Sequence, residues 1–429
     1  MLPQGWATVP IGDLCSLKNG RAFKPSDWTK SGLPIVRIQN LNNREASFNH
    51  YSGEVEERYY LKGGELLFAW SGTPGTSFGA HVWRGGEAVL NQHIFRVDFD
   101  ASSIEKRFFR FAINQKLGEL IDIAHGGAGL QHVTKGKFES TEVSIPPLSE
   151  QTRIADRLDA LLARVGVTRA RLDRVPALLK QFRQSVLAAA TSGELTREYR
   201  EIQGASLTGT TLGEIMKVSS GKFLPAKSMA EGGAIPVYGG NGVNGYHNEA
   251  NVFEATLVIG RVGFYCGSVH MTPASAWVTD NALIVKHDEN KTSRKYLFFA
   301  LQSIDLRTND SSTAQPVISG QKIYPLAAKL PSLAEQAEIV RRVESLFVLA
   351  DKVQAQYEAA RARVDKLTPA LLAKAFRGEL VPQDPNDEPA EKLLERLRAS
   401  KADEGTVTKR RRTKAAAKKT PNKKAKGAR

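Results

Sequence analysis

Two long stretches of the chain carry mainly apolar residues at alternating spacings of four and three. In the first stretch these positions are Ile154, Leu158, Leu161, Val165, Thr168, Leu172, Val175, Leu179, Phe182 and Val186. In the second they are Ile339, Val343, Leu346, Ala350, Val353, Tyr357, Ala360, Val364, Leu367 and Leu371. A sustained period of about 3.5 residues with charges between predicts a coiled-coil seam. Each stretch therefore predicts a long helix of about 40 residues, or roughly 60 Å.

The signals at the ends of these stretches favour the same helices. An acidic residue and a glutamine follow Pro146-Pro147 and Pro331 closely, which is typical of a helix start. Gly193 and Gly378 are stop signals. Pro176 lies inside the first pattern, where proline costs about 3 kcal/mol or kinks the helix, so we expect a break there.

Both stretches belong to an internal repeat. Residues 131–195 align with 316–380 without a gap, most closely at Ile145-Pro-Pro-Leu-Ser-Glu-Gln151 against Leu330-Pro-Ser-Leu-Ala-Glu-Gln336. A single apolar stripe would more often belong to a helix that faces a domain core. Two equal stripes in one chain instead favour an intramolecular pair of helices.

The remaining parts, residues 1–150 and 205–330, contain short β-type runs separated by glycine and asparagine clusters. They predict mixed α/β domains rich in loops. We expect the following organisation: 1–149 and 201–333 as the two loop-rich domains, 150–200 and 334–380 as the two helices, 381–408 as a linker with a short helix, and 409–429 as a basic tail.

Composition places the chain among soluble globular proteins. Of its 429 residues 41% are hydrophobic, and its formal charge of +15 is concentrated at one end. Residues 409–429 hold eleven lysines and arginines and no acid, which leaves +4 for the rest. This tail cannot bury enough apolar surface to fold, so we expect it to be disordered. Two cysteines and the lack of a long apolar run favour a reducing cytoplasm and argue against a membrane.

Catalytic motifs are not evident in the sequence. Gly240-Asn-Gly-Val-Asn-Gly245 matches a dinucleotide fingerprint, but the residues after it do not read as a helix that would cap a phosphate. Gly221-Lys222 is followed by Phe223, where a phosphate loop needs Ser or Thr. The eight histidines form no metal-binding spacing, and no Asn-Pro-Pro-Tyr-like motif of an adenine methyltransferase occurs. We therefore expect no catalytic residue, no metal site and no cofactor in this chain.

Two divergent loop-rich domains, each followed by an equivalent long helix, resemble the specificity subunit of type I restriction-modification systems. The quoted repeat motifs carry this resemblance, together with Tyr238-Gly-Gly-Asn-Gly242 and Ala375-Phe-Arg-Gly-Glu-Leu-Val-Pro-Gln-Asp-Pro-Asn-Asp-Glu-Pro389. It covers residues 1 to about 395. The basic tail lies outside the pattern.

The resemblance implies a non-catalytic subunit whose two target-recognition domains each read one half of an asymmetric, interrupted DNA sequence. It implies that the long helices pair antiparallel. It also implies two methylation subunits as partners, which bind S-adenosylmethionine and methylate adenine at N6, and two restriction subunits that translocate DNA.

Polar and basic residues in the loops are the candidates for DNA contact, because such side chains pair with base edges and phosphates. In the first domain they are Lys18, Asn19, Arg21, Arg37, Asn40, Ser71 and Thr73. In the second they are Ser220, Lys222, Tyr238, Asn241, Asn244, Tyr246, Ser312 and Gln315. The alternative function is a coiled-coil DNA-packaging protein without sequence specificity, which the histone-like tail favours. The DNA sequence read does not follow from these residues.

Overall fold

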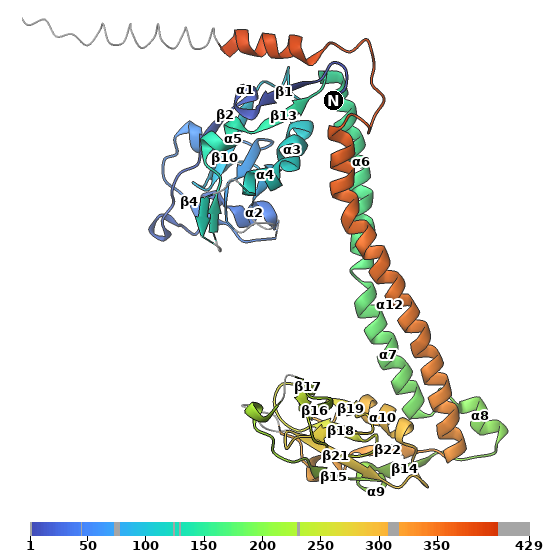
Figure 1. Ribbon diagram of the computed structural model, residues 1–429. Helices are drawn as coiled ribbons and strands as arrows, with labels where there is room; N and C mark the ends of the chain where they lie inside the picture. The colour runs from blue at the N-terminus through green and yellow to red at the C-terminus, as the bar shows by residue number, and fades with distance from the viewer. Residues whose placement is uncertain are drawn as a thin grey trace, which may run out of the picture. The chain divides into compact units, whose positions relative to one another are not determined.

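The computed structural model divides into two compact units, the first made of residues 1–169 and 362–429 and the second of residues 170–361 (Figure 1). The residues that the structure describes are 2–43, 45–72, 78–122, 125–127, 130–229, 232–307 and 317–401. Thr73, Ser312, Gln315 and the basic tail, all named above, lie outside them. Both units mix strands and helices, which confirms the α/β prediction.

Unit 1 is built on a four-stranded antiparallel sheet in the order β2-β10-β6-β8. These strands are β2 (Cys15–Asn19), β6 (Leu66–Ala69), β8 (Gly79–Val82) and β10 (Ile94–Phe99). All four residues of β6 are buried, because it lies between two neighbours and is covered on both faces. Helix α3 (Lys106–Gln115) adds Phe108, Phe109 and Phe111 to the same core.

Unit 1 contains further sheets. β1 (Ala7–Pro10) pairs antiparallel with β13 (Glu142–Ile145). A second four-stranded sheet has the order β4 (Asn49–Tyr51), β3 (Leu33–Val36), β9 (Ala88–Leu90), β5 (Tyr60–Leu61). A three-stranded sheet has the order β11 (His125–Gly127), β12 (Leu130–His132), β7 (Ser71–Gly72). The short helices of this unit are α1 (Ile11–Leu14), η1 (Pro25–Asp27), α2 (Ile38–Asn42), η2 (Glu57–Tyr59), α4 (Leu117–Asp122) and α5 (Lys135–Ser140).

Unit 2 repeats this plan with a different sequence. Its four-stranded antiparallel sheet has the order β15 (Met216–Ser220), β21 (Ala282–His287), β18 (Leu257–Gly260), β19 (Val269–Met271). β14 (Thr208–Thr211) pairs with β22 (Ala327–Leu330), as β1 does with β13. A three-stranded sheet has the order β17 (Gly242–His247), β16 (Ile235–Gly239), β20 (Trp277–Val278). The helices here are α8 (Arg197–Ile202), α9 (Leu212–Ile215), η3 (Ala226–Ser228), α10 (Arg294–Ser303) and α11 (Gly320–Ile323).

Each long helix begins where the repeat predicts one. The first is divided into α6 (Leu148–Leu172) and α7 (Val175–Ser192), and Pro176 lies in the first turn of α7. The break predicted at this proline is therefore confirmed, and there the missing N–H costs no helical hydrogen bond. The second, α12 (Leu333–Phe376), is continuous although it contains Pro369, which the sequence analysis overlooked.

The long helices pair antiparallel. In unit 2, Arg183 of α7 forms an ion pair of 2.7 Å with Asp351 of α12, and Arg361 pairs with Asp173, which precedes α7. In unit 1, Arg169 of α6 reaches Asp365 of α12 at 2.9 Å. From one ion pair to the next, the residue number decreases on α12 by the same amount as it increases along α6 and α7. The two stretches of seam thus contact each other, as expected (Figure 1).

The seam is less continuous than the sequence predicts. Ile154, Leu158, Ile339 and Val343 are fully buried, whereas the predicted seam residues Val353 and Leu367 are 38% and 42% exposed. A helix of 3.6 residues per turn drifts by about 20° per heptad from a 3.5-residue repeat, so a two-helix pair does not keep every seam position covered. The continuous seam predicted from spacing is wrong at these positions.

The end of the described chain completes the core of unit 1. Residues 390–401 are helical, and their buried face consists of Ala390, Leu393, Leu394 and Leu397. The backbone N–H of Ala390 donates to the carbonyl of Gly5 at 2.9 Å. The short helix expected after residue 381 is therefore part of the packed domain. Among the described helices, none has the length and apolar content needed to span a membrane.

Candidate nucleic-acid interface

The loop after β2 in unit 1 and the loop after β15 in unit 2 make equivalent backbone hydrogen bonds. In unit 1 the N–H of Gly20 donates to the carbonyl of Ile94, and that of Arg21 to Leu90 at 2.9 Å. In unit 2 Gly221 donates to Ala282, and Lys222 to Val278, also at 2.9 Å. The two candidate cations, Arg21 and Lys222, are thus structural equivalents.

Glycine is required in this loop because two backbones meet there. A Cβ on Gly20 would lie 2.1 Å from the carbonyl oxygen of Asn91, and one on Gly221 would lie 2.3 Å from that of Thr279. No side chain fits at these distances. The glycines therefore fix where the following cation leaves the sheet.

In unit 1 aromatic rings hold two arginines near this loop. The guanidinium of Arg21 lies 4.9 Å from the centre of the Tyr51 ring and donates to its hydroxyl at 3.0 Å. Arg37 lies over the ring of Trp28 at 5.4 Å. Asn91 links the two sites, because its N–H donates to Val36, the neighbour of Arg37. Cation–π contact orients a guanidinium without neutralising it, so its remaining donors stay available.

An aromatic and histidine cluster stands beside these arginines, and the sequence analysis missed it. Trp70 follows β6 and stacks on Phe95 with ring centres 5.5 Å apart. His93 and His132 approach the same indole at 5.4 and 5.8 Å. Burial, followed by the neighbouring His132, lowers the pKa of His93. Its imidazole is therefore neutral near pH 7 and offers one donor and one acceptor.

In unit 2 the corresponding end of the four-stranded sheet carries polar side chains. Arg261 follows β18, in the place that Trp70 has after β6, because Gly260 pairs with Ala282 as Ala69 does with Ile94. Its guanidinium donates to the Ser220 hydroxyl at 3.2 Å and to the Asp280 carbonyl at 3.4 Å. The sequence analysis did not name Arg261, since nothing in its local sequence marks it.

Several predicted contact residues are exposed at or near this end of the four-stranded sheet in their unit, and others are buried. Ser220, Lys222, Asn241, Asn244 and Tyr246 are exposed, as is Asn19, whose amide oxygen accepts from Trp70 Nε1 at 3.4 Å. Lys18 is also exposed and forms an ion pair of 2.7 Å with Asp98. Ser71 and Tyr238 are buried, and the Tyr238 hydroxyl donates to the Met271 carbonyl.

Asn40 has a structural role. It is 5% exposed, its amide oxygen accepts from the N–H of Arg37, and its nitrogen donates to the carbonyls of Ala46 and Ser47. This asparagine shapes the loop that carries Arg37. We therefore leave Asn40, Ser71 and Tyr238 out of the candidate contact surface.

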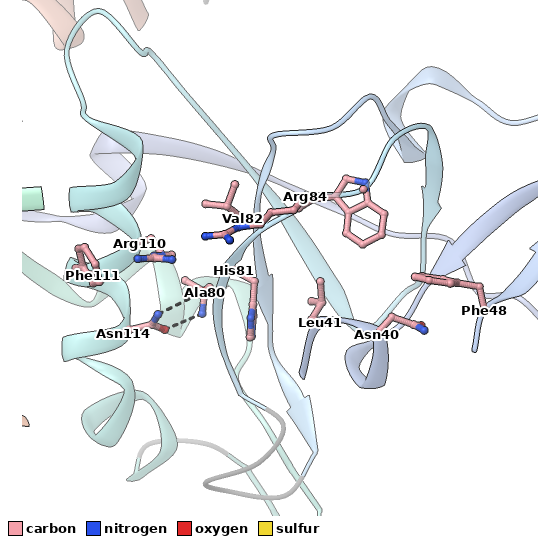
Figure 2. A pocket seen from close by; sticks show the side chains of 12 residues that line it. Asn40, Leu41, Phe48, Ala80, His81, Val82, Arg84, Arg110, Phe111 and Asn114 are labelled. Carbon is pink, nitrogen blue, oxygen red and sulfur yellow. Dashed lines mark hydrogen bonds between the residues drawn. The ribbon is translucent and has the colours of Figure 1, made fainter. Parts of the chain in front are cut away.

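A cavity of about 630 Å³ opens beside the edge strand β8 of unit 1, between α2 and α3 (Figure 2). The side chains of His81, Arg84 and Arg110 line it, and none of its described lining residues carries a carboxylate. Burial and then Arg110 lower the pKa of His81. The amide of Asn114 makes hydrogen bonds of 2.7 and 3.0 Å to the backbone N–H and carbonyl of Ala80, which covers this part of the strand edge. Its basic lining makes the cavity unsuitable for a cation.

The two equivalent sheet ends agree with the comparison with known protein families. A family model described as the type I restriction modification DNA specificity domain matches residues 3–177 and again residues 209–356, which together are more than half of the chain. The chain belongs to this specificity family. Specificity subunits are non-catalytic DNA-recognition components. The repeat found in the sequence, residues 131–195 and 316–380, overlaps the end of each matched stretch and extends past it.

Similar proteins span nearly the same length as this specificity chain. The specificity subunit of the type I restriction enzyme EcoDI from Escherichia coli is 31% identical, over 94% of this chain and 97% of its own. That of EcoBI, also from Escherichia coli, is 29% identical over 93% of each chain.

Solved structures show the same fold. A chain from a type I restriction-modification system, solved to explain complex assembly and conformational transition, covers 88% of this chain with a TM-score of 0.69 at 19% identity. The HsdS subunit of Thermoanaerobacter tengcongensis also covers 88%, with a TM-score of 0.56 at 18% identity.

Proposed function

We propose that this specificity chain selects the DNA target of a type I restriction-modification complex, unit 1 reading one half of an interrupted target and unit 2 the other. The observation that carries this is the equivalence of the two edges. The same glycine turn presents Arg21 in one unit and Lys222 in the other, and the strand end that carries Trp70 in one carries Arg261 in the other. Equal scaffolds with different side chains read two different half-sites, so the target is asymmetric.

The side chains on each edge suit base recognition. A guanidinium such as that of Arg21 donates two parallel hydrogen bonds to the O6 and N7 atoms of guanine in the major groove. The neutral imidazole of His93 pairs with either a donor or an acceptor. In unit 2, Arg261, Ser220 and Asn241 offer the corresponding groups. Lys222 carries a point charge, which suits a phosphate as well as a base.

The chemistry belongs to partner subunits in this proposal. We infer two methylation subunits, which bind S-adenosylmethionine and methylate adenine at N6, and two restriction subunits that translocate DNA. Support comes from the curated relatives, which are specificity subunits of restriction enzymes. Adenine N6 lies inside the base stack, so a methylation subunit rotates the base out while this chain sets its position. The non-specific packaging alternative has no support from the family match.

The test is to express the chain with and without its methylation subunit and to sequence the methylated adenines. We expect a motif of two unlike half-sites, separated by an unspecified spacer, only when both proteins are present. Methylation spread without a motif would contradict the proposal. Methyl transfer by the purified chain alone would contradict its non-catalytic role.

A further inference from the structure

Two exposed aromatic side chains stand out on unit 2. Phe264 and Tyr265 lie in the loop that joins β18 to β19, and they are 83% and 53% exposed. Their rings touch edge to face, with centres 5.1 Å apart. Leaving two adjacent aromatic rings in water forfeits the stabilisation that burial gives, so the pair is poorly explained by folding alone.

Hydrogen bonds and two glycines with positive φ define the backbone conformation of the loop that carries them. Gly263 and Gly267 have φ values of +85° and +88°, and Gly267 N–H donates to the Gly260 carbonyl at 2.8 Å. Cys266 is buried, and its N–H donates to the Gly263 carbonyl at 3.0 Å. These contacts fix the base of the loop and point to a defined presentation of its tip.

The position of the loop connects it to the reading edge. Ser268, in the same loop, donates its hydroxyl to the Gly240 carbonyl at 2.8 Å, next to the exposed Asn241. Arg261, where the loop begins, donates to Ser220. The aromatic pair therefore shares the end of the sheet from which base contacts are expected.

Phe253, another exposed phenylalanine of unit 2, lies away from this loop. Phe253 is 78% exposed and lines a cavity together with Leu257, the first residue of β18, and His287, the last residue of β21. Phe264 instead follows Gly260, at the other end of β18. Phe253 thus matches Phe264 in residue type and exposure but not in location.

We propose that Phe264 and Tyr265 form a wedge that enters the base stack of the half-site read by unit 2, at the step opened when the partner rotates the adenine out. This inference rests on the proposed function and adds the residues that support base opening. Removing a base from the stack exposes the faces of its neighbours, and an aromatic ring covers such a face. Apolar wedges of this kind hold opened steps in other DNA complexes.

The test uses the complete complex with its methylation subunits. Base opening is read on a duplex with 2-aminopurine, which fluoresces when unstacked, in place of the target adenine of one half-site at a time. The methylation rate is read on the unmodified duplex, because 2-aminopurine has no N6 amino group to accept a methyl group. In the double variant Phe264→Ala, Tyr265→Ala we expect the fluorescence increase and the methylation rate to fall about 5- to 100-fold at the half-site of unit 2. The other half-site should be unchanged. Phe253→Ala should stay within about twofold of the wild type, because it lies away from the DNA edge.

A second duplex separates opening from recognition. With a mismatched base opposite the target adenine, the stack is already weakened, so the double variant should recover most of the lost rate. Tyr265→Phe should retain activity, because stacking needs the ring and not the hydroxyl. Wild-type fluorescence in the double variant, equal losses at both half-sites, or no recovery on the mismatched duplex would each overturn the wedge. If the wild-type complex shows no preferred half-sites, the proposed function fails instead.

Discussion

At the scale of single residues, two glycines determine how the cations are presented. Gly20 and Gly221 sit where the Cβ of any other residue would collide with a carbonyl oxygen of the facing loop. The residue that follows each glycine is thereby held at one place on the sheet, whatever its side chain. If Arg21 and Lys222 contact DNA as proposed, a new side chain at either position changes the contact without a change of the loop.

We predict that Arg21→Ala relaxes only the half-site read by unit 1, and Lys222→Ala affects only that of unit 2. A bidentate base contact is worth about 1 to 3 kcal/mol, so discrimination at one base pair should fall roughly 5- to 150-fold. Loss of a phosphate contact would instead lower affinity and its salt dependence without changing the motif. The control is Lys217→Ala, at the other end of β15 from Lys222. Methylation maps decide, and relaxation of both halves by one substitution would refute the division.

At the scale of elements, one glutamine ties each long helix to its recognition domain. Gln151 accepts from the N–H of Glu105, the residue that caps α3, at 2.9 Å and donates to the Pro146 carbonyl. Gln336 does the same in unit 2, where it accepts from Ser293 at 2.7 Å. Both side chains are fully buried. The motif Leu-x-Glu-Gln is therefore a joint between helix and domain as well as a helix start.

Replacing this glutamine should destabilise unit 2. Gln336→Leu keeps a side chain of similar size but leaves the N–H of Ser293 and the carbonyls of Lys291 and Pro331 without their partner. Each buried unpaired group costs about 1 to 3 kcal/mol, so we expect unfolding of unit 2 to become easier by about 2 kcal/mol or more. Gln354→Leu, on the same helix, loses only a surface contact with Glu358 and should cost less than about 0.5 kcal/mol. Hydrogen exchange of the α10 amides in the two variants measures the difference. Equal effects would contradict the role of Gln336 in holding α12 to its recognition domain.

At the scale of the whole molecule, the antiparallel register decides how the helices are lengthened together. Insertions at positions that are equivalent in the sequence repeat, such as after Val167 and after Lys352, would not face each other in the helix pair. Because Arg169 pairs with Asp365 and Asp173 with Arg361, the insertion that matches one after Val167 lies after Lys366. Only facing insertions leave every ion pair in place.

Inserting one heptad at each of these two positions lengthens the helix pair by about 10 Å. If the paired helices set the distance between half-sites, the unspecified spacer should grow by up to about 3 base pairs, while both half-sites keep their sequences. Selection of bound duplexes from a library with random spacers measures the preferred length. A stable variant that still prefers the original spacer would refute the role of the helices as a spacer.

The basic tail offers a separate prediction at this scale. Residues 409–429 lie outside the described part of the chain and hold +11 of the formal charge of +15. A chain truncated after residue 408 should recognise the same motif, because charge attraction to phosphates is independent of sequence. Its affinity and the salt dependence of that affinity should fall, as binding titrations at two or more salt concentrations will show. A changed methylation motif would place the tail in the recognition apparatus.

The sequence by itself determined the features that depend on local periodicity and on repetition. The 4,3 spacing predicted both long helices, Pro176 predicted the break, and the repeat predicted two similar domains, because each of these is encoded in residues close along the chain. It also drew attention to Arg21 and Lys222, through the polar loops that contain them.

Only the tertiary structure decided which side chains share a surface. Trp70, His93 and His132 meet in unit 1, and Ser220 meets Arg261 in unit 2, through strand pairings between segments distant in sequence. Burial of Asn40 likewise depends on a loop that closes over it. Hydrogen bonds of this kind leave no period in the sequence, so a polar loop predicts a contact surface without telling which of its members face outwards.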